Sequence, residues 1–283
     1  MKWRGRRGSR NIEDRRRSGG VARTGGIGGI GLVVVVLIGL FLGVDVTPLL
    51  QGGGGQVTGG GQTEITQADE DAAQFVSVTL ADTEEVWSEI FRTQIGERYD
   101  PPTLVLFKGL TRSPCGGARG ASGPFYCPAD EKAYLDTAFF TTLSRQLGAS
   151  GDFAAAYVVA HEVAHHVQNE LGILGQANRI RAQSSLARAN AISVRIELQA
   201  DCFSGIWARY AQERFNTLER GDLDEAMNAA RQIGDDTLQR NAGRAPNPHS
   251  FTHGTSEQRQ RWFARGYNDP QIQNCDTFSA QRL

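Results

Sequence analysis

The stretch "DFAAAYVVAHEVAHHVQNEL", residues 152–171, predicts a helix around which the fold can be worked out. Asp152 can cap this helix, because a carboxylate at a helix start accepts hydrogen bonds from the free backbone amides. One face carries residues at a helical spacing of three or four: Phe153, Tyr157, Val158, His161, His165 and Gln168. The two imidazoles therefore lie on the same face of the helix.

Residues 161–166, "HEVAHH", contain three of the five histidines of the chain. His161 and His165 are four positions apart, so about 40° separates them around the axis and both can reach one ion. His166 would lie about 140° from His161, which excludes joint chelation and leaves packing or hydrogen bonding from an adjacent face. Glu162 stands next to the first ligand, where the H-E-x-x-H pattern uses a glutamate as the base that takes a proton from metal-bound water.

Two ligands leave zinc short of the three that a catalytic site uses, so a third is expected elsewhere. The stretch "RIELQADCFSGIW", residues 195–207, places Glu197 and Asp201 four positions apart on an otherwise apolar helix. A buried carboxylate needs a partner. Zinc on Glu197 and an imidazole N–H on Asp201 would provide one for each. The alternative is that the two carboxylates lie on the surface and form ion pairs with Arg195 or Arg209.

A second candidate for the chemistry is His253 in "PHSFTHGTSEQRQRW", residues 248–262. It precedes a helix start expected at Thr255 or Ser256, a position from which a side chain can project into a cleft. There it could donate a hydrogen bond to the oxyanion that forms when a peptide carbonyl is attacked. The alternative is an ordinary surface histidine.

Charge and hydropathy divide the N-terminal part of the chain. Residues 1–23 hold nine Lys/Arg against two acidic residues, a net charge of +7, so the remainder carries −8 of the overall −1. Residues 24–44 are uncharged and long enough for the roughly 20 residues of a transmembrane helix. The basic flank places the N-terminus in the cytoplasm and the rest of the chain outside it. This predicts a single-pass membrane protein whose domain lies outside the cytoplasm.

Two alternatives to this reading remain. A cleaved signal peptide has a shorter apolar core and a small-residue cleavage site, for which "GVDVTPLL" is a poor match. A basic arm can also bind nucleic acid, but beside a membrane span it is better explained by topology and anionic lipid, so no nucleic-acid partner is expected.

The rest of the chain divides into a linker and one domain. Residues 45–63 include "QGGGGQVTGGGQ", typical of a flexible tether, and residues 64–283 are expected to fold as the domain. Periodicity predicts helices within 68–96 and 138–148, over 152–171, 176–215, 222–233 and 255–267, and short strands at 102–109, 124–128 and 132–137. Residues 111–128, rich in Gly and Pro, are predicted to be loop outside that second strand. The architecture is thus a helix-dominated α+β domain with a small sheet, preceded by one transmembrane helix.

Four cysteines lie in the part assigned outside the cytoplasm, where thiols tend to be oxidised. Cys115 and Cys127 flank the Gly-rich loop, and closing it would remove about 3 kcal/mol of unfolded-chain entropy. This favours a Cys115–Cys127 disulfide and leaves Cys202 to pair with Cys275. Free buried cysteines are the alternative, and a zinc–thiolate site is disfavoured because no C-x-x-C occurs.

Several stretches together resemble the bacterial neutral zinc metallopeptidase family: "RGRRGSRNIEDRRR", "CGGARGASGPFYCPADEKAYLD", "HEVAHHVQ", "ELQADCFSGIWA" and "THGTSEQRQRWFARGY". The resemblance implies a single-span membrane protein with a zincin-like peptidase domain. More distantly, the order H-E-x-x-H, E-x-x-A-D and a later His is similar to gluzincin peptidases that process membrane proteins. The roles that this pattern implies are zinc ligands for His161, His165 and Glu197, general base for Glu162, orientation of a ligand for Asp201 and transition-state donor for His253.

Only 31 residues separate His165 from Glu197, and one membrane helix is expected where the membrane-embedded relatives have several, so the site should lie in an aqueous domain. The sequence therefore predicts a membrane-anchored endopeptidase that binds one Zn²⁺ per chain and hydrolyses peptide or protein substrates through a zinc-activated water with Glu162 as base. The alternatives are a non-catalytic envelope protein stabilised by zinc and a zinc amidase acting on cell-wall peptides.

Overall fold

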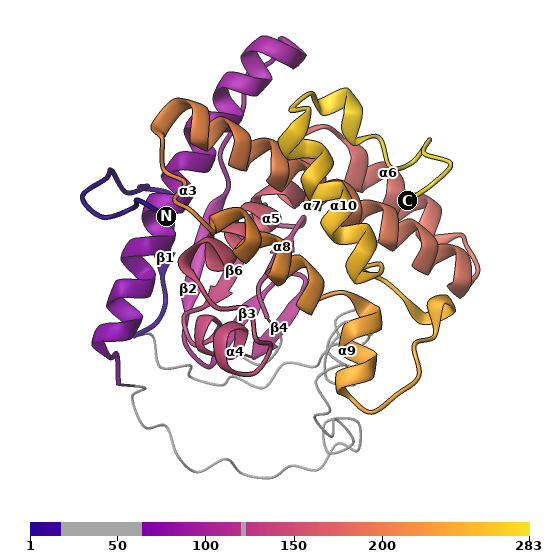
Figure 1. The fold of residues 1–283 in the computed structure, drawn as a ribbon, viewed down its shortest axis with the longest axis horizontal. Helices are drawn as coiled ribbons and strands as arrows, with labels where there is room; N and C mark the ends of the chain where they lie inside the picture. Colours follow the sequence, from indigo (N-terminus) through magenta and orange to yellow (C-terminus); the bar gives the residue numbers. More distant parts are fainter. Residues whose placement is uncertain (18–63, 120–122) are drawn as a thin grey trace.

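Helix α5 (Asp152–Glu170) lies at the centre of the fold. The computed structural model describes residues 1–17, 64–119 and 123–283. In this part of the chain, α5 contacts α3 (Gln67–Ile90), α7 (Leu186–Phe215), α8 (Asp222–Gln232) and the two strands β5 (Phe125–Cys127) and β6 (Lys132–Asp136) (Figure 1). Most of its residues are buried, so this one helix is enclosed on nearly every side and its polar side chains must find partners inside the protein.

A four-stranded sheet in the order β1-β2-β6-β5 covers one side of α5. Its strands are β1 (Ile12–Asp14), β2 (Thr103–Phe107), β5 (Phe125–Cys127) and β6 (Lys132–Asp136). The pairs β1–β2 and β2–β6 are parallel, and β5 runs antiparallel to β6. The expected strands β2, β5 and β6 are confirmed, whereas β1 was not expected.

Strands β3 (Leu110–Ser113) and β4 (Gly116–Arg119) form a separate antiparallel pair. The prediction that this region is all loop is therefore wrong. The chain turns at Pro114 and Cys115. Gly116, which follows the turn and pairs with Ser113, has a φ of +128° that suits glycine, and the Ser113 hydroxyl donates to the Gly116 carbonyl. Backbone pairing alone defines this hairpin, so no alternating apolar pattern revealed it.

Helices make up most of the remaining described residues. They are α4 (Phe139–Arg145), α6 (Ile173–Ala182), α7 (Leu186–Phe215), α8 (Asp222–Gln232), α9 (Asp235–Asn241) and α10 (Ser256–Asn268). The helix expected over 176–215 is in fact two, because Ser185 starts a new helix by accepting a hydrogen bond from the Arg188 amide. The short helix α9 was not expected.

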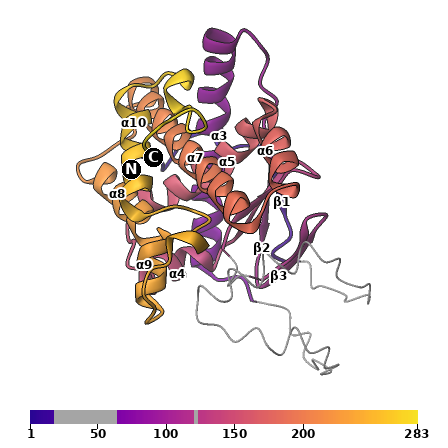
Figure 2. The same cartoon turned by 90° about the vertical axis from the view of Figure 1, so that its right-hand side faces the viewer.

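Helices α7 and α10 approach each other unusually closely (Figure 2). Two glycines permit this contact. A Cβ on Gly205 would lie 2.0 Å from the Phe263 carbonyl oxygen, and one on Gly266 would lie 1.9 Å from the Cys202 carbonyl oxygen. Because backbone touches backbone here, α10 is held at a fixed depth against α7, and this places the side chains of α10 within reach of the α7 carboxylates.

Residues 1–17 are part of the folded domain and lie against α3 (Figure 1). Trp3 is buried in the main core and packs edge-on against Phe75 of α3, with ring centroids 5.5 Å apart. The Arg16 guanidinium is also buried and donates to Asp14 and Glu70. The arm thus contributes an edge strand, core side chains and ion pairs to the domain.

These contacts correct the expected membrane topology. The predicted transmembrane helix, residues 24–44, and the whole of the predicted linker, residues 45–63, lie outside the described residues. Among the residues that the structure does describe, no helix is both long and apolar enough to cross a membrane. Residues 1–17 pack on the domain, so they cannot lie across a membrane from it. The fold class is therefore helix-dominated α+β with a small sheet. The predictions of a transmembrane helix, a membrane partner and a single-pass localisation are wrong for the described residues.

Two disulfides join the cysteines in the expected pairing. Cys115 is bonded to Cys127 and ties the β3–β4 pair to β5. Cys202, on α7, is bonded to Cys275 and ties the C-terminal segment to that helix. Both Cys202 and Cys275 are fully buried, so the second disulfide is part of the core.

The packing of the N-terminal segment predicts that Trp3→Ala destabilises the whole domain. Truncating a buried Trp removes its packing and leaves a cavity, which costs about 3 kcal/mol or more. The free energy of unfolding, measured by denaturant titration of the full chain, should fall by that amount. The matched control is Lys2→Ala, an exposed neighbour, for which a change within about 0.5 kcal/mol is expected. Equal effects of the two changes would contradict the packing of this segment.

Candidate metal centre

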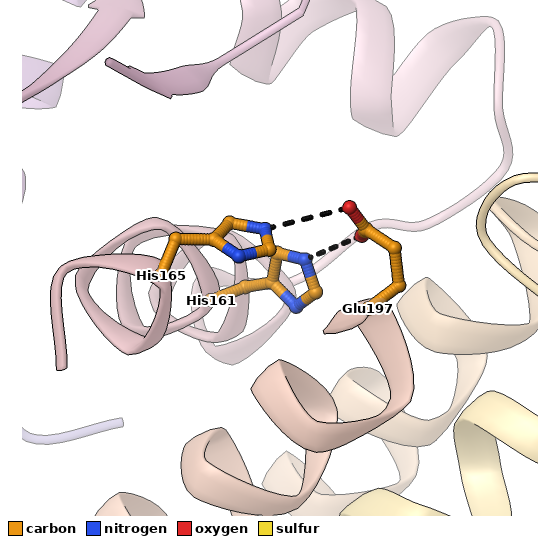
Figure 3. Close-up of side chains that lie close together, drawn as sticks. All are labelled: His161, His165 and Glu197. Atoms are coloured by element: carbon orange, nitrogen blue, oxygen red, sulfur yellow. Dashed lines mark hydrogen bonds and ion pairs between the residues drawn. The ribbon is translucent and has the colours of Figure 1, made fainter. Parts of the chain in front are cut away.

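Helices α5 and α7 bring two imidazoles and one carboxylate together (Figure 3). Nε2 of His161 lies 3.1 Å from one oxygen of Glu197, and Nε2 of His165 lies 3.6 Å from the other. One ligand atom from each of the three residues falls within 4.8 Å of the others. The structure thus assembles the predicted ligand set, and two nitrogens with one carboxylate oxygen are a donor set that zinc accepts in catalytic sites.

Asp201 lies behind the first histidine. It is fully buried on α7, one turn after Glu197. Its Oδ1 lies 3.0 Å from Nδ1 of His161, but the two groups are not aligned for a hydrogen bond. The Arg259 guanidinium of α10 donates to both oxygens of Asp201, at 2.8 and 2.9 Å. The hydroxyl of Tyr157, one turn before His161, also donates to Asp201. The expected proximity of Asp201 to His161 is therefore present, whereas the expected hydrogen bond from the imidazole N–H is not.

The charges of this cluster suit a cation at its centre. Burial by itself lowers the pKa of His161, but the carboxylates of Asp201 and Glu197 outweigh it and raise the pKa to about 9. Burial opposes ionisation of Glu197 as well, yet the three histidines around it hold its pKa well below the usual range. A proton on His161 therefore balances the carboxylates in the metal-free protein, and a divalent ion bound between them would take over that role.

Glu162 has the environment that a general base needs. Its side chain is buried beside His161, and this burial is the largest cause that raises its pKa to about 7. The negative charge of Glu197 raises the pKa further, while the positive charges of His161, Arg259 and His253 oppose the rise. The carboxyl of Glu162 can thus hold or release a proton near neutral pH.

His253 belongs to the same group of charges. It lies in the loop before α10, whose cap is Thr255 as expected, and it is near enough to Glu197 and Glu162 for their charges to interact. Its backbone amide donates to the buried carboxylate of Asp235, and its Nδ1 lies 3.3 Å from the same group. Burial lowers the pKa of His253, but Glu197 and Asp235 outweigh it and raise the pKa. Its side chain is 37% exposed, so it can be reached by a bound molecule.

His166 is separate from this cluster. Its Nδ1 lies 3.0 Å from the Tyr126 hydroxyl of β5, and its Nε2 lies 2.7 Å from the Asp100 carbonyl oxygen. The residue is buried between the rings of Tyr99 and Tyr126. It joins α5 to the sheet side of the molecule, on the adjacent face where the helical spacing placed it.

Sequence reasoning missed three residues that support the centre, namely Arg259, Tyr157 in its polar role, and Asp235. Arg259 is one of several arginines on α10, and only the depth at which α10 packs on α7 singles it out. Tyr157 gave a usable signal, since it shares a face with His161 one turn away. Asp235 starts a short helix that no pattern predicted, and it accepts backbone amides of residues 252–254.

A helix-borne H-E-x-x-H with a glutamate from a neighbouring helix defines the zinc metallopeptidase type of site. The chain belongs to the family described as "Putative neutral zinc metallopeptidase", whose model matches residues 1–278. It is 45% identical over 288 residues to "Uncharacterized protein YpfJ" of Escherichia coli (strain K12), covering 98% of this chain and 99% of that protein. It is 44% identical over 229 residues to "Uncharacterized protein Rv2575" of Mycobacterium tuberculosis (strain ATCC 25618 / H37Rv), covering 75% of this chain and 74% of that protein. No solved structure matches the chain.

The raised pKa of His161 predicts a distinct histidine signal in the metal-free protein. One of the five imidazoles should titrate near pH 9 in an NMR titration of the ring protons, and the His161→Gln variant should lack that signal. Glu197→Gln keeps the shape of a neighbouring side chain but removes its charge, so the same pKa should fall by about one unit or more. The account of the charges would be wrong if every imidazole titrated below pH 8.

Proposed function

We propose that the protein is a zinc-dependent peptidase that uses His161, His165 and Glu197 as ligands and Glu162 as general base. The observation that carries this proposal is the buried Glu162 beside a group of three possible ligand atoms, which is the number that catalytic zinc sites use and one fewer than structural sites use. Membership of the zinc metallopeptidase family supports it independently. The proposed substrates are peptides or proteins with accessible peptide bonds, and the proposal requires no membrane anchor.

Zinc, when bound, supplies Lewis acidity that polarises a carbonyl oxygen and lowers the pKa of water. The remaining work is done by side chains of this chain. Glu162 accepts the proton of the attacking water and passes it to the nitrogen of the leaving amine. Because its pKa is near 7, its carboxyl can both take up and give up a proton near neutral pH. Asp201, held by Arg259, keeps the His161 ring turned with Nε2 toward Glu197.

His253 has the position of a donor to the developing oxyanion. It is partly exposed, it interacts with the charges of Glu162 and Glu197, and its raised pKa favours the protonated, donating form. Asp235 restrains it through the backbone and through the ring nitrogen. A positively charged donor fixed at this place would stabilise negative charge on the carbonyl oxygen of the substrate.

The proposal predicts that Glu162→Gln abolishes hydrolysis and leaves zinc bound. Loss of a general base costs about 10²- to 10⁴-fold in kcat, whereas the three ligands stay intact. The full chain should be assayed on casein and on isolated cell wall side by side, and zinc per chain should be measured in the same samples. Hydrolysis of casein supports the peptidase, and release of peptide from the cell wall alone would assign an amidase instead.

The matched control for this experiment is Glu170→Gln at the end of the same helix. Glu170 is half-buried but lies more than two turns from Glu162 and is not one of the metal-binding group. Its substitution should change neither kcat nor zinc content. Hydrolysis that survives Glu162→Gln, with Glu170→Gln as the reference, would exclude Glu162 as the base.

Removal of zinc separates a catalytic from a structural metal. The Asp201–Arg259 ion pair, the Tyr157 hydrogen bond and the Cys202–Cys275 disulfide join the helices around the site without any metal. A chelator should therefore abolish hydrolysis while the helical circular dichroism signal persists, and added zinc should restore activity. Loss of the helical signal on chelation would instead support the non-catalytic, zinc-stabilised alternative.

A further inference from the structure

Gln168 is a fully buried residue of α5, one turn beyond the second histidine of the candidate metal centre. Its Oε1 lies 2.9 Å from Nδ1 of His165. Its Nε2 lies 2.8 Å from the Ile196 carbonyl oxygen and 3.0 Å from Oε1 of Gln199, both on α7. Every polar atom of the Gln168 amide therefore has a partner, in a place where an unpaired one would be costly.

The partners of this amide fix which way it points. A backbone carbonyl can only accept, so the Ile196 carbonyl requires the NH₂ group of Gln168 on its side. The Gln168 oxygen then faces His165. Because that oxygen can only accept, Nδ1 of His165 must carry the proton, and its Nε2 presents a lone pair toward Glu197.

A second fixed point agrees with this orientation. The NH₂ group of Gln199 donates to the Cys275 carbonyl, 3.0 Å away, which again can only accept. The Gln199 oxygen is thereby turned toward Gln168, where it accepts the hydrogen bond from the Gln168 NH₂ group. Gln199 and Cys275 are buried, and Cys275 is held on α7 by its disulfide to Cys202.

Gln168 also connects the two ligand-bearing helices at the level of the ligands. It holds the imidazole of His165 on its own helix, and it binds the carbonyl of Ile196, the residue directly before Glu197, on α7. The neutral side chain of Gln168 thus fixes the orientation of the His165 ring relative to the backbone of α7 next to Glu197. His161, by contrast, is backed by the charged Asp201–Arg259 pair.

We propose that Gln168 is a positioning residue of the metal centre, which fixes His165 as the Nδ1–H tautomer with Nε2 free to bind the metal. Gln199 and the disulfide-anchored Cys275 carbonyl hold Gln168 in turn. The inference rests on the metal site of the proposed function and on nothing in its catalytic steps. It makes the C-terminal segment part of the support of the site.

The first test is made on the wild-type protein, and a variant serves only to assign the signals. In the metal-free, ¹⁵N-labelled full chain, two-bond ¹⁵N–¹H correlation spectra distinguish the two neutral tautomers of each histidine, and His165→Gln identifies the signals of His165. The expected result is a protonated Nδ1 and an unprotonated Nε2 on His165. The opposite tautomer would overturn the proposal, whatever the outcome of the peptidase assay.

The second test measures zinc affinity by competition with a chromogenic chelator. Gln168→Met keeps the size of the side chain but removes its acceptor and donors, so affinity should fall by about 10- to 100-fold. Gln199→Met should cause a smaller loss, because the Ile196 carbonyl still orients Gln168. The control is Gln176→Met on an exposed face of α6, which should not change affinity.

The cobalt-substituted protein provides a readout of geometry. The visible absorption bands of bound Co²⁺ should shift in Gln168→Met and should match the wild type in Gln176→Met. Affinity and spectrum in Gln168→Met equal to those of the control would overturn the proposal. If Gln168→Met does not fold, Gln199→Met and the tautomer of the wild-type protein decide the question. None of these measurements uses a substrate, so a failed peptidase assay leaves them intact.

Discussion

The buried carboxylate of Asp201 is the constraint on which the rest of the structure depends. It has no exposed surface, and a carboxylate in that position costs several kcal/mol unless cations and donors surround it. Its partners come from two other helices: Tyr157 and His161 from α5, and Arg259 from α10. Satisfying this single group on α7 therefore sets the arrangement of α5, α7 and α10, and the close contact of α10 with α7 at Gly205 is what lets Arg259 reach it.

How much of the site could be predicted depends on whether its signal is local. The spacing of His161 and His165, and that of Glu197 and Asp201, are properties of single helices, and both pairs lie where helical geometry placed them. Arg259 could not be found in this way. It stands among other arginines in "SEQRQRWFAR", and its burial depends on a glycine contact between helices that no periodicity encodes.

The same distinction explains the errors in the fold. Strand β1, "IED", is three residues long and pairs with a parallel strand some ninety positions later, so it has neither alternation nor a turn to reveal it. The basic composition around it suggested a separate arm. Composition counts charges but not partners, and here Arg16 is neutralised by Asp14 and Glu70 while Trp3 enters the core. This arginine-rich segment is therefore part of the domain and not a separate arm.

The environment also shifts the pKa values of two glutamates that the sequence presents alike in opposite directions. Burial raises the pKa of both carboxyls. Around Glu197 the histidines outweigh it, and the group remains ionised as a ligand should. Around Glu162 they do not, and the negative charge of Glu197 adds to the rise, so its pKa reaches about 7. The negative charge of Glu197 thus helps to keep the pKa of Glu162 near neutral. Under the proposed function, these two neighbouring acidic groups would serve as ligand and base without exchanging roles.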